Sequence, residues 1–502
     1  MKKIYSLIAI AMLSVTGATA QRYMTEQFTS VDVQTDVTYG VNATVLYAPF
    51  NGYLAVPEAL KMDVYTPTGD TETNRPVILY FHTGNFLPFP DNQGTGGTKT
   101  DATIVELCTR LAKLGYVVAS CDYRLGWNPI ASDQEVRVNT LINAAYRGVQ
   151  DCRTAVRYFR KTAAEAGNPF GIDPSRVAVW GQGTGGYISF AVTGIDAYTD
   201  LLLPKFTTSA GFPMVSDIVN GDINGTSFGV NPLNGDTLCY ANHVGYSSEI
   251  NVALNMGGAC GDSSWIDATD NPMISFHVPT DPFAPYYTGV VQVPGLGLNV
   301  VEVQGSYDIQ MLMSAYGNNG VFELAEGYAP GQAYTDAANT TNNGFHGLFP
   351  LERPTGMEAD SSPWDWWDAA TNVNSDNGFL TNPDMSMAKG MTYCDTIMGY
   401  SVPRLACALN LSTSPCYVGI DETQEVSFNV FPNPANESFA IRALERVSAV
   451  RVFDAMGRVV YNSNTTNQEV VFIDSSNWSA GMYTVEIHTS NNAVARKKML
   501  KN

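Results

Sequence analysis

Residues 177–187 read Val-Ala-Val-Trp-Gly-Gln-Gly-Thr-Gly-Gly-Tyr, and this stretch decides the fold. Four apolar residues in a row predict a short strand that is buried on both faces. Four glycines follow within six residues, so we expect a sharp turn and then a helix that begins near Thr184. A buried strand, a crowded turn and a helix in succession indicate one unit of a parallel sheet covered by helices.

The same alternation extends to both sides of this stretch. Buried-type strands are predicted at 76–81, 116–121, 273–276 and 321–324, and helices at 101–114, 148–166, 309–316 and 386–409. Short β-type runs at 31–47 and 60–65 come first. Residues 196–265 lose the periodicity, which predicts a lid or an inserted subdomain. The expected fold is therefore α/β, with a mostly parallel sheet covered by helices.

The pattern changes again from Val426 onward. Six or seven short strands are separated there by turn residues. This predicts a small, separate β-sandwich over residues 426–502. The expected linker to it is 419–425.

Composition excludes some classes of partner. The chain has 502 residues, of which 45% are hydrophobic, and its net charge is −20. The charge belongs to the main body, because residues 421–502 carry nine acidic and eight basic residues. A negative field of this kind repels phosphate backbones and anionic lipid surfaces, so we expect no nucleic-acid partner.

The first 20 residues predict a signal peptide. Lys2 and Lys3 precede an apolar run, and Ala18-Thr19-Ala20 is typical of a cleavage site. This run is shorter than the ~20 residues that cross a bilayer, and no later run is long enough, so we expect an exported, soluble chain. Eight cysteines are enough for four disulfides in an oxidising compartment, and they allow 105 pairings. None forms a Cys-x-x-Cys pair, and no metal or other cofactor is expected.

The opening stretch has the context of a nucleophile elbow, written G-x-S-x-G. Three further motifs accompany it: Phe-His-Thr-Gly-Asn-Phe at 81–86, Arg-Gly-Val-Gln-Asp at 147–151 and Gly-Ile-Asp-Pro-Ser-Arg at 171–176. Together they resemble the carboxylesterase branch of the α/β-hydrolase family over roughly residues 55–410. The resemblance implies an α/β-hydrolase domain over residues 21–418, with the insertion at 196–265.

The resemblance aligns Gly183 with the nucleophile, where relatives carry serine. Glycine has no side chain to attack an ester, although it tolerates the strained backbone of the turn well. Thr184 lies one residue further on and is a weaker candidate nucleophile. A literal G-x-S-x-G at 225–229 contains Ser227, but no buried strand precedes it and no helix follows, which favours an ordinary turn.

The resemblance also implies the other site residues. Asp281, after the strand at 273–276, takes the place of the acid, and the base must follow it in the chain. Of the later histidines, His346 lies in the main body, so we expect it to hydrogen-bond Asp281 and face Gly183. Backbone N–H groups of Thr83, Gly84 or Asn85, and Thr184 would hold an oxyanion.

Two further segments have alternative interpretations. Residues 220–231 show the oxygen spacing of a calcium loop but lack its final glutamate, so a turn is favoured over calcium. Three tryptophans lie within 364–367, and they either pack in the core or line a cleft.

The end of the chain has a resemblance of its own. Four motifs carry it: Phe-Pro-Asn-Pro-Ala at 431–435, Asp-Ala-Met-Gly-Arg at 454–458, Ser-Ala-Gly-Met-Tyr at 479–483 and the basic end at 496–498. They resemble the C-terminal sorting domain of type IX secretion. This implies recognition by that secretion machinery and a secreted or cell-surface location.

Two functional hypotheses remain open at this point. The first is a secreted esterase-fold protein with an impaired nucleophile, which binds a small or polymeric ester-like ligand. The second is an active hydrolase that uses Thr184, Ser227 or a water molecule activated by His346. Under the first hypothesis, we expect Gly183→Ser to restore part of the covalent route.

Overall fold

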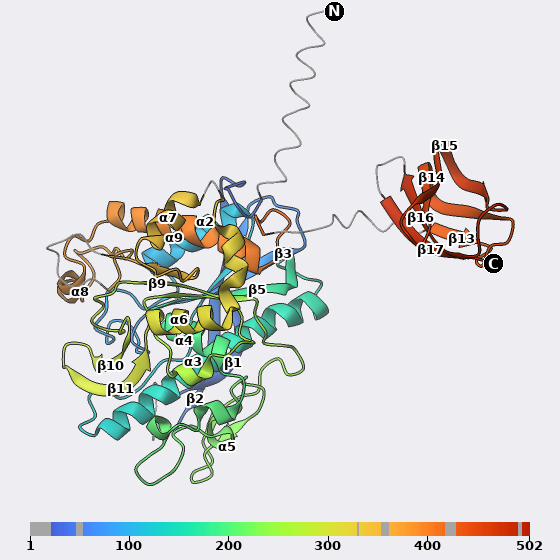
Figure 1. Cartoon of the computed structure of the whole chain (residues 1–502). Helices are drawn as coiled ribbons and strands as arrows, with labels where there is room; N and C mark the ends of the chain where they lie inside the picture. The colour runs from blue at the N-terminus through green and yellow to red at the C-terminus, as the bar shows by residue number, and fades with distance from the viewer. Residues whose placement is uncertain (1–21, 47–53, 329–330, 353–360, 417–427, 490–493) are drawn as a thin grey trace, which may run out of the picture. The chain divides into compact units, whose positions relative to one another are not determined.

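The computed structural model describes residues 22–46, 54–328, 331–352, 361–416, 428–489 and 494–502 (Figure 1). The predicted signal peptide and the predicted linker lie outside the described residues. The chain divides into two compact units, residues 1–417 and residues 418–502. Each unit is described by itself.

The first unit is built on an eight-stranded sheet in the order β1-β2-β4-β3-β5-β8-β9-β12. Its strands are β1 (Val31–Thr44), β2 (Val56–Pro67), β3 (Arg75–Phe81), β4 (Val117–Cys121), β5 (Ile172–Gln182), β8 (Val252–Met256), β9 (Met273–His277) and β12 (Leu348–Pro350). β2 is antiparallel to β1 and β4, and all the other pairs are parallel. The mostly parallel α/β sheet predicted from the sequence is confirmed.

Helices cover both faces of this sheet (Figure 1). One face packs against α2 (Ala102–Leu114), α7 (Gln332–Asn339) and α9 (Met387–Ala408), and the other against α3 (Gln134–Glu165), α4 (Thr184–Gly194) and α6 (Ser306–Tyr316). Alternate residues of a strand face opposite sides, so Val179 joins the α3 core whereas Trp180 joins the α9 core. Burial on both sides explains the continuous apolar runs of the central strands.

Several elements differ from the sequence predictions. The predicted insertion at 196–265 contains β8, which is buried in the middle of the main sheet; its five residues gave too short a signal. The predicted strand at 321–324 is part of a 3₁₀ helix, η6 (Asn318–Ala325), because short apolar runs do not distinguish strand from helix. The helix predicted to begin at Gly148 begins 14 residues earlier, at Gln134.

Shorter elements connect the sheet strands. Between α4 and β8 lie η3 (Tyr198–Leu201), η4 (Pro204–Phe206), α5 (Asp217–Asn220) and the paired strands β6 (Gly229–Val230) and β7 (Thr237–Cys239). η5 (Ser263–Trp265) follows β8, and a hairpin of β10 (Thr288–Val293) and β11 (Leu298–Gln304) follows β9. α8 (Ser375–Thr381) precedes α9.

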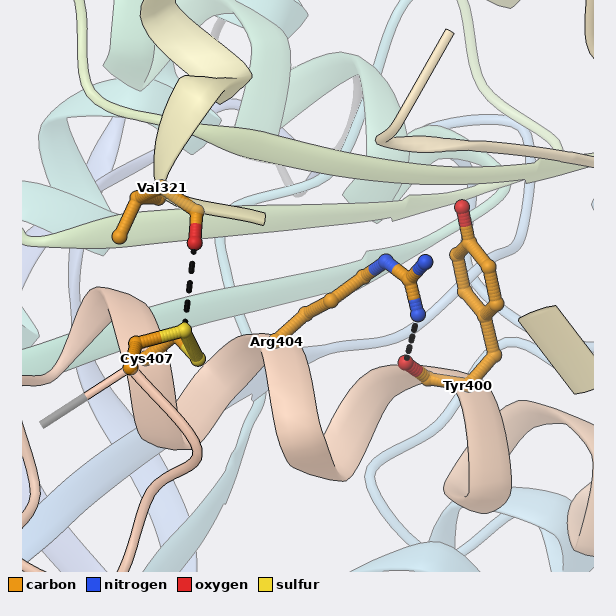
Figure 2. Close-up of a disulfide and its surroundings, with 5 residues drawn as sticks. Val321, Tyr400, Arg404 and Cys407 are labelled. Carbon is orange, nitrogen blue, oxygen red and sulfur yellow. Dashed lines mark hydrogen bonds between the residues drawn. A yellow bond between two sulfur atoms is a disulfide. The ribbon is translucent and has the colours of Figure 1, made fainter. Parts of the chain in front are cut away.

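One disulfide, Cys407–Cys416, closes the end of α9 (Figure 2). The Cys416 Sγ lies 3.3 Å from the Val321 carbonyl oxygen. Figure 2 also shows the Arg404 guanidinium beside the Tyr400 ring. The other six cysteines are unpaired and buried, so of the four disulfides that eight cysteines allow, the structure forms one. These six thiols lie on different elements and pack as small apolar side chains.

The second unit is antiparallel throughout its sheet. It consists of β13 (Phe428–Phe431), β14 (Ser438–Phe453), β15 (Val459–Asp474), β16 (Gly481–Thr489) and β17 (Val494–Lys501) around a buried apolar core. Along one side, β14 pairs first with β13 and then with β16, and along the other it pairs with β15, with register shifts after Arg442. The predicted small β-sandwich is confirmed, with fewer and longer strands.

Candidate active site

The turn between β5 and α4 centres on Gly183. Its φ of 54° and ψ of −114° lie where a side chain is strained, and glycine adopts them at little cost. The Gly183 N–H donates to the Met256 carbonyl at 2.8 Å, which fixes the turn to the end of β8. The strand, turn and helix predicted from residues 177–187 are therefore present, with Gly183 at the carboxyl end of β5.

Neighbouring glycines let α4 press directly onto the sheet. A Cβ built on Gly185 would overlap the Phe81 carbonyl oxygen and lie 2.7 Å from the Phe81 carbonyl carbon. A Cβ built on Gly181 would overlap the Gly185 carbonyl group. Real Cβ atoms do not approach backbone so closely, so these contacts require glycine at both positions.

The loop after β3 is joined to this turn through His82. The His82 carbonyl accepts the Gly185 N–H at 3.1 Å and the Tyr123 hydroxyl at 2.9 Å. Its ring is 2% exposed, stacks on Tyr123 and donates from Nδ1 to the Thr83 carbonyl at 2.5 Å. His82 therefore holds the loop against α4.

A buried ion pair supports the chain next to Tyr123. Arg124 and Asp151 have fully buried side chains, and the Arg124 Nη2 lies 2.9 Å from an Asp151 carboxylate oxygen. The same carboxylate accepts the Arg124 N–H at 2.8 Å. The acidic end of the Arg-Gly-Val-Gln-Asp motif thus positions the segment that carries Tyr123.

The Thr184 hydroxyl contacts the Tyr123 hydroxyl and not a group that could act as a base. Its Oγ1 lies 2.8 Å from the Tyr123 hydroxyl. Because Tyr123 donates its proton to the His82 carbonyl, Thr184 donates to Tyr123. Burial raises the pKa of Tyr123, which keeps this phenol protonated and unable to take a proton from threonine. The placement of the Thr184 side chain does not favour a role as nucleophile.

Asp281 lies in the loop after β9, at the same edge of the sheet as Gly183. Its Oδ1 accepts the N–H groups of Phe283 at 2.7 Å and Ala284 at 3.1 Å. Its Oδ2 lies 3.9 Å from His277 Nε2. His277 is fully buried, donates from Nε2 to the Ala284 carbonyl and lies 2.7 Å from the Ser306 hydroxyl through Nδ1. Burial lowers the pKa of His277 to about 4, so this ring is neutral at neutral pH and already has two partners.

His346 lies near the opposite edge of the sheet. β12 is parallel to β9, with Leu348 opposite Ser275, so a residue before β12 lies toward the amino end of β9. Asp281 comes after the carboxyl end of β9. The His346 ring instead lies 2.7 Å from Glu326 and 3.7 Å from Glu323. The structure therefore does not bring His346 to Asp281 or Gly183, and the expected pairing is corrected because the strand direction separates them.

The loop that follows β12 offers no replacement histidine. Residues 351–363 contain none, and the described part of this loop places Ser361 and Ser362 beside the turn. No histidine is found among the described residues that line the cavity next to Gly183.

That cavity has a volume of about 150 Å³ and mostly apolar walls. Gly183, Thr184, Asp281 and Thr83 lie on its polar side. The apolar walls come from α3, η4, η5, the β10–β11 hairpin and the loops after β3 and β4, and they include Phe86, Trp127, Leu141, Phe206, Trp265 and Val303. A larger, more polar cleft of about 340 Å³ shares Thr83, Asn85 and Phe283 with it.

The backbone donors expected to hold an oxyanion belong to residues that line the cavity or the neighbouring cleft. Within the described residues, the backbone N–H groups of Thr83, Gly84, Asn85 and Thr184 have no protein acceptor. Gly84 and Asn85 have φ values of 122° and 56°, which turn the loop sharply at the cavity. The site can therefore still donate hydrogen bonds to an oxygen of a bound molecule.

The remaining candidates lie elsewhere. The Ser227 hydroxyl accepts the Asp222 N–H at 2.8 Å in a turn outside the cavity. The Asp222 carboxylate accepts the N–H groups of Asn224 and Thr226 in the same turn, and the Asn224 side-chain Oδ1 accepts from Arg153 at 3.1 Å. Hydrogen bonds and a guanidinium thus occupy oxygens of the calcium-like loop at 220–231.

Two contributions were not predicted from sequence. Trp127 and Trp265 line the apolar cavity, although no local motif marks them. The Thr83 side chain lies against Gly183, whereas only the Thr83 backbone had been expected to act there. Of the three tryptophans in 364–367, Trp364 is fully buried in the core and Trp367 lines the polar cleft.

Comparison with protein families agrees with this description. Residues 62–203 match a family described as BD-FAE, an esterase domain of the α/β-hydrolase type. Residues 429–502 match the secretion system C-terminal sorting domain. The first unit is an esterase-like α/β-hydrolase domain, and the second is a type IX secretion sorting domain, which indicates a secreted or cell-surface protein.

Individual proteins are more distant. Esterase 2 of Thermogutta terrifontis with propionate bound is 16% identical, with 70% of this chain and 92% of that chain covered and a TM-score of 0.34. The form phosphorylated by paraoxon is 19% identical, with 52% and 75% covered and a TM-score of 0.30. The ulvan lyase NLR42 of Nonlabens ulvanivorans is 30% identical over 87 residues, 17% of this chain, and the match spans only 16% of that relative's length.

Among the described residues, no helix has the length and apolar character needed to cross a membrane.

Proposed function

We propose that the secreted esterase-like domain binds a small ester-like molecule in the cavity beside Gly183 and does not cleave it by a covalent route. One observation carries this proposal: residue 183, which the resemblance aligns with the nucleophile, is a glycine in a sharp turn between strand and helix. Covalent ester cleavage needs a hydroxyl or thiol activated by a neighbouring base.

The described residues that line the cavity also contain no histidine to act as a base. Asp281 lies at the cavity, but the histidine that would stand between an acid and a nucleophile is missing from the described lining. His346 is held by glutamates near the other edge of the sheet, and His277 is buried with partners on both nitrogens. The alternative of an active hydrolase through Thr184, Ser227 or a His346-activated water molecule has no geometric support in these positions.

Binding, in contrast, needs only what the cavity retains. The N–H groups of Thr83, Asn85 and Thr184, which line the cavity and have no protein acceptor among the described residues, offer hydrogen bonds to a carbonyl oxygen. Apolar walls favour an apolar acyl or aryl group beside that carbonyl. Phenyl butyrate combines both features and serves as a probe.

The binding test uses fluorescence. Titration of phenyl butyrate into the secreted protein should change the emission of Trp127 and Trp265, which line the cavity. Ala145→Phe, which places a ring in the cavity from α3, should abolish the change. Val136→Phe, on an exposed position of the same helix, is the matched control and should bind normally.

The chemical test is labelling by a fluorophosphonate. We expect no label on the wild-type protein and no turnover of phenyl butyrate above background. A stoichiometric label would contradict the proposal, and its position on Thr184 or Ser227 would establish the hydrolase alternative.

A further inference from the structure

The Thr83 side chain occupies the space where the side chain of residue 183 would begin. A Cβ built on Gly183 would overlap the Thr83 hydroxyl oxygen and lie 2.8 Å from Thr83 Cβ. Thr83 belongs to the loop after β3, whereas Gly183 belongs to the turn after β5. A hydroxyl therefore does lie beside the elbow, but it comes from another segment of the chain.

This hydroxyl is available to a ligand. Within the described residues, Thr83 Oγ1 makes no hydrogen bond to protein, and the Thr83 carbonyl alone is engaged, by His82. Thr83 lines both the apolar cavity and the polar cleft and is only partly buried. A polar atom at the junction of two cavities, without a protein partner, is positioned to bind a guest molecule.

The same hydroxyl is poorly placed as a nucleophile. Activation requires a base within about 2.6–3.2 Å, and no such acceptor of the Thr83 hydroxyl is present in the described part of the chain. The hydroxyl can donate a neutral hydrogen bond but has no group to take its proton.

We propose that Thr83 is the polar anchor of the cavity. Its hydroxyl donates to the carbonyl oxygen of the bound ester-like molecule, next to the backbone donors of the loop. Its side chain also excludes any side chain larger than hydrogen from position 183. This inference rests on the proposed function for its ligand, while its steric part stands on the Thr83–Gly183 contact alone.

The steric part changes an expectation drawn from sequence. Gly183→Ser was expected to restore part of the covalent route, but the new Cβ would collide with Thr83. The serine would also face a positive φ and find no histidine beside it. We therefore expect no recovered labelling from Gly183→Ser.

The anchor is tested by phenyl butyrate binding to Thr83→Val and Thr83→Ser. Valine keeps the branched shape without the hydroxyl, so loss of one neutral hydrogen bond should weaken binding about threefold to tenfold. Serine keeps the hydroxyl and should bind within about twofold of wild type. Wild-type binding that Thr83→Val leaves unchanged would overturn the anchor and leave the proposed function intact. A wild type that does not bind would overturn both.

The steric part is tested by thermal unfolding of a double-mutant cycle. Gly183→Ser should lower the melting temperature, and in a Thr83→Gly background that loss should fall to about half or less, because residues in contact are not additive. Gly211→Ser is the matched control: its φ is 83° but no atom lies within 4 Å of its Cβ position. Its effect should be the same in both backgrounds. Equal losses for Gly183→Ser in both backgrounds would overturn the steric claim.

Discussion

The turn at Gly183 and the loop at His346 lie toward opposite edges of the same sheet, and they are built in opposite ways. At the turn, backbone packs on backbone, and no Cβ fits on Gly181 or Gly185. At the loop, a Cβ on Gly344 would meet nothing within 4 Å, and the His346 side chain is 30% exposed. The turn at Gly183 therefore leaves no room for added side-chain atoms, whereas the loop at His346 has open space for them.

The contrast shows that backbone packing can hold the form of the turn without any reactive side chain. The backbone around Gly183 is maintained by contacts with β3, β5 and β8 that need no reactive side chain. His346 is a histidine that follows Asp281 in the chain, as a catalytic base would. Its ring, however, contacts Glu323 in η6 and Glu326, the residue after η6. Chain order therefore does not by itself bring residues to the same edge of a sheet.

The largest expected effect comes from Gly185→Ala. The added methyl group would overlap the Phe81 carbonyl, so destabilisation should exceed the ~1–3 kcal/mol that is usual for overpacking. Gly344→Ala, at the other edge, should cost only about 1 kcal/mol for its left-handed backbone. Urea unfolding of both variants measures the contrast. Similar losses would contradict the claim that the two regions differ in packing.

The second largest effect is expected for Asp151→Ala. It leaves the fully buried Arg124 without its carboxylate, which typically costs about 3–5 kcal/mol. The partly exposed His346–Glu326 contact should matter far less, and Glu326→Gln should cost at most about 1 kcal/mol. The free energies of unfolding of the two variants provide the comparison, and a larger loss for Glu326→Gln would reverse it.

A smaller effect should appear as a pH dependence of stability through His277. Its pKa in the folded state, about 4, lies below the unfolded value of about 6.5, so the unfolded chain binds more protons between these values. Stability from this group is present above pH 6.5 and is lost as the pH falls toward 4, on the order of 2 kcal/mol at pH 4.5.

The control for this prediction is His277→Gln, compared with wild type at pH 7 and pH 4.5. Asp270 has the opposite influence, because burial raises its pKa to about 7 and acidification then favours the folded state. Both proteins contain Asp270, so its contribution cancels when the stability lost by His277→Gln on acidification is subtracted from that lost by wild type. An equal loss of stability on acidification in both proteins would exclude His277 as the cause.

The smallest effect is expected for His346→Ala. The ring contacts surface glutamates, so stability should change by less than about 1 kcal/mol, and phenyl butyrate binding should not change. Fluorescence titration of this variant measures its affinity for phenyl butyrate. Weakened binding would show that His346 takes part in the binding site and would contradict its placement at the opposite edge of the sheet from Gly183.

The sequence was sufficient to predict the elbow and the fold. A buried run at 177–180 followed by alternating glycines has few structural solutions, since strand, positive φ and close helix packing all require those residue types at those places. The motifs of the sorting domain were equally informative, because they recur in order along one short segment. These motifs each consist of a few consecutive residues, so they can be recognised from the sequence alone.

Contacts between distant segments were decided only by the tertiary structure. The five residues of β8 gave no clear pattern, yet they form a central strand because β5 and β9 bury them on both sides. His346 precedes β12 and Asp281 follows β9, and because these two strands are parallel, the two residues lie at opposite edges of the sheet. The sequence alone does not give the direction of β12. Thr83 reached Gly183 across 100 residues because β3 and β5 are neighbours and end together. Adjacency in a parallel sheet depends on strand order and register, and these are properties of the whole chain rather than of any stretch within it.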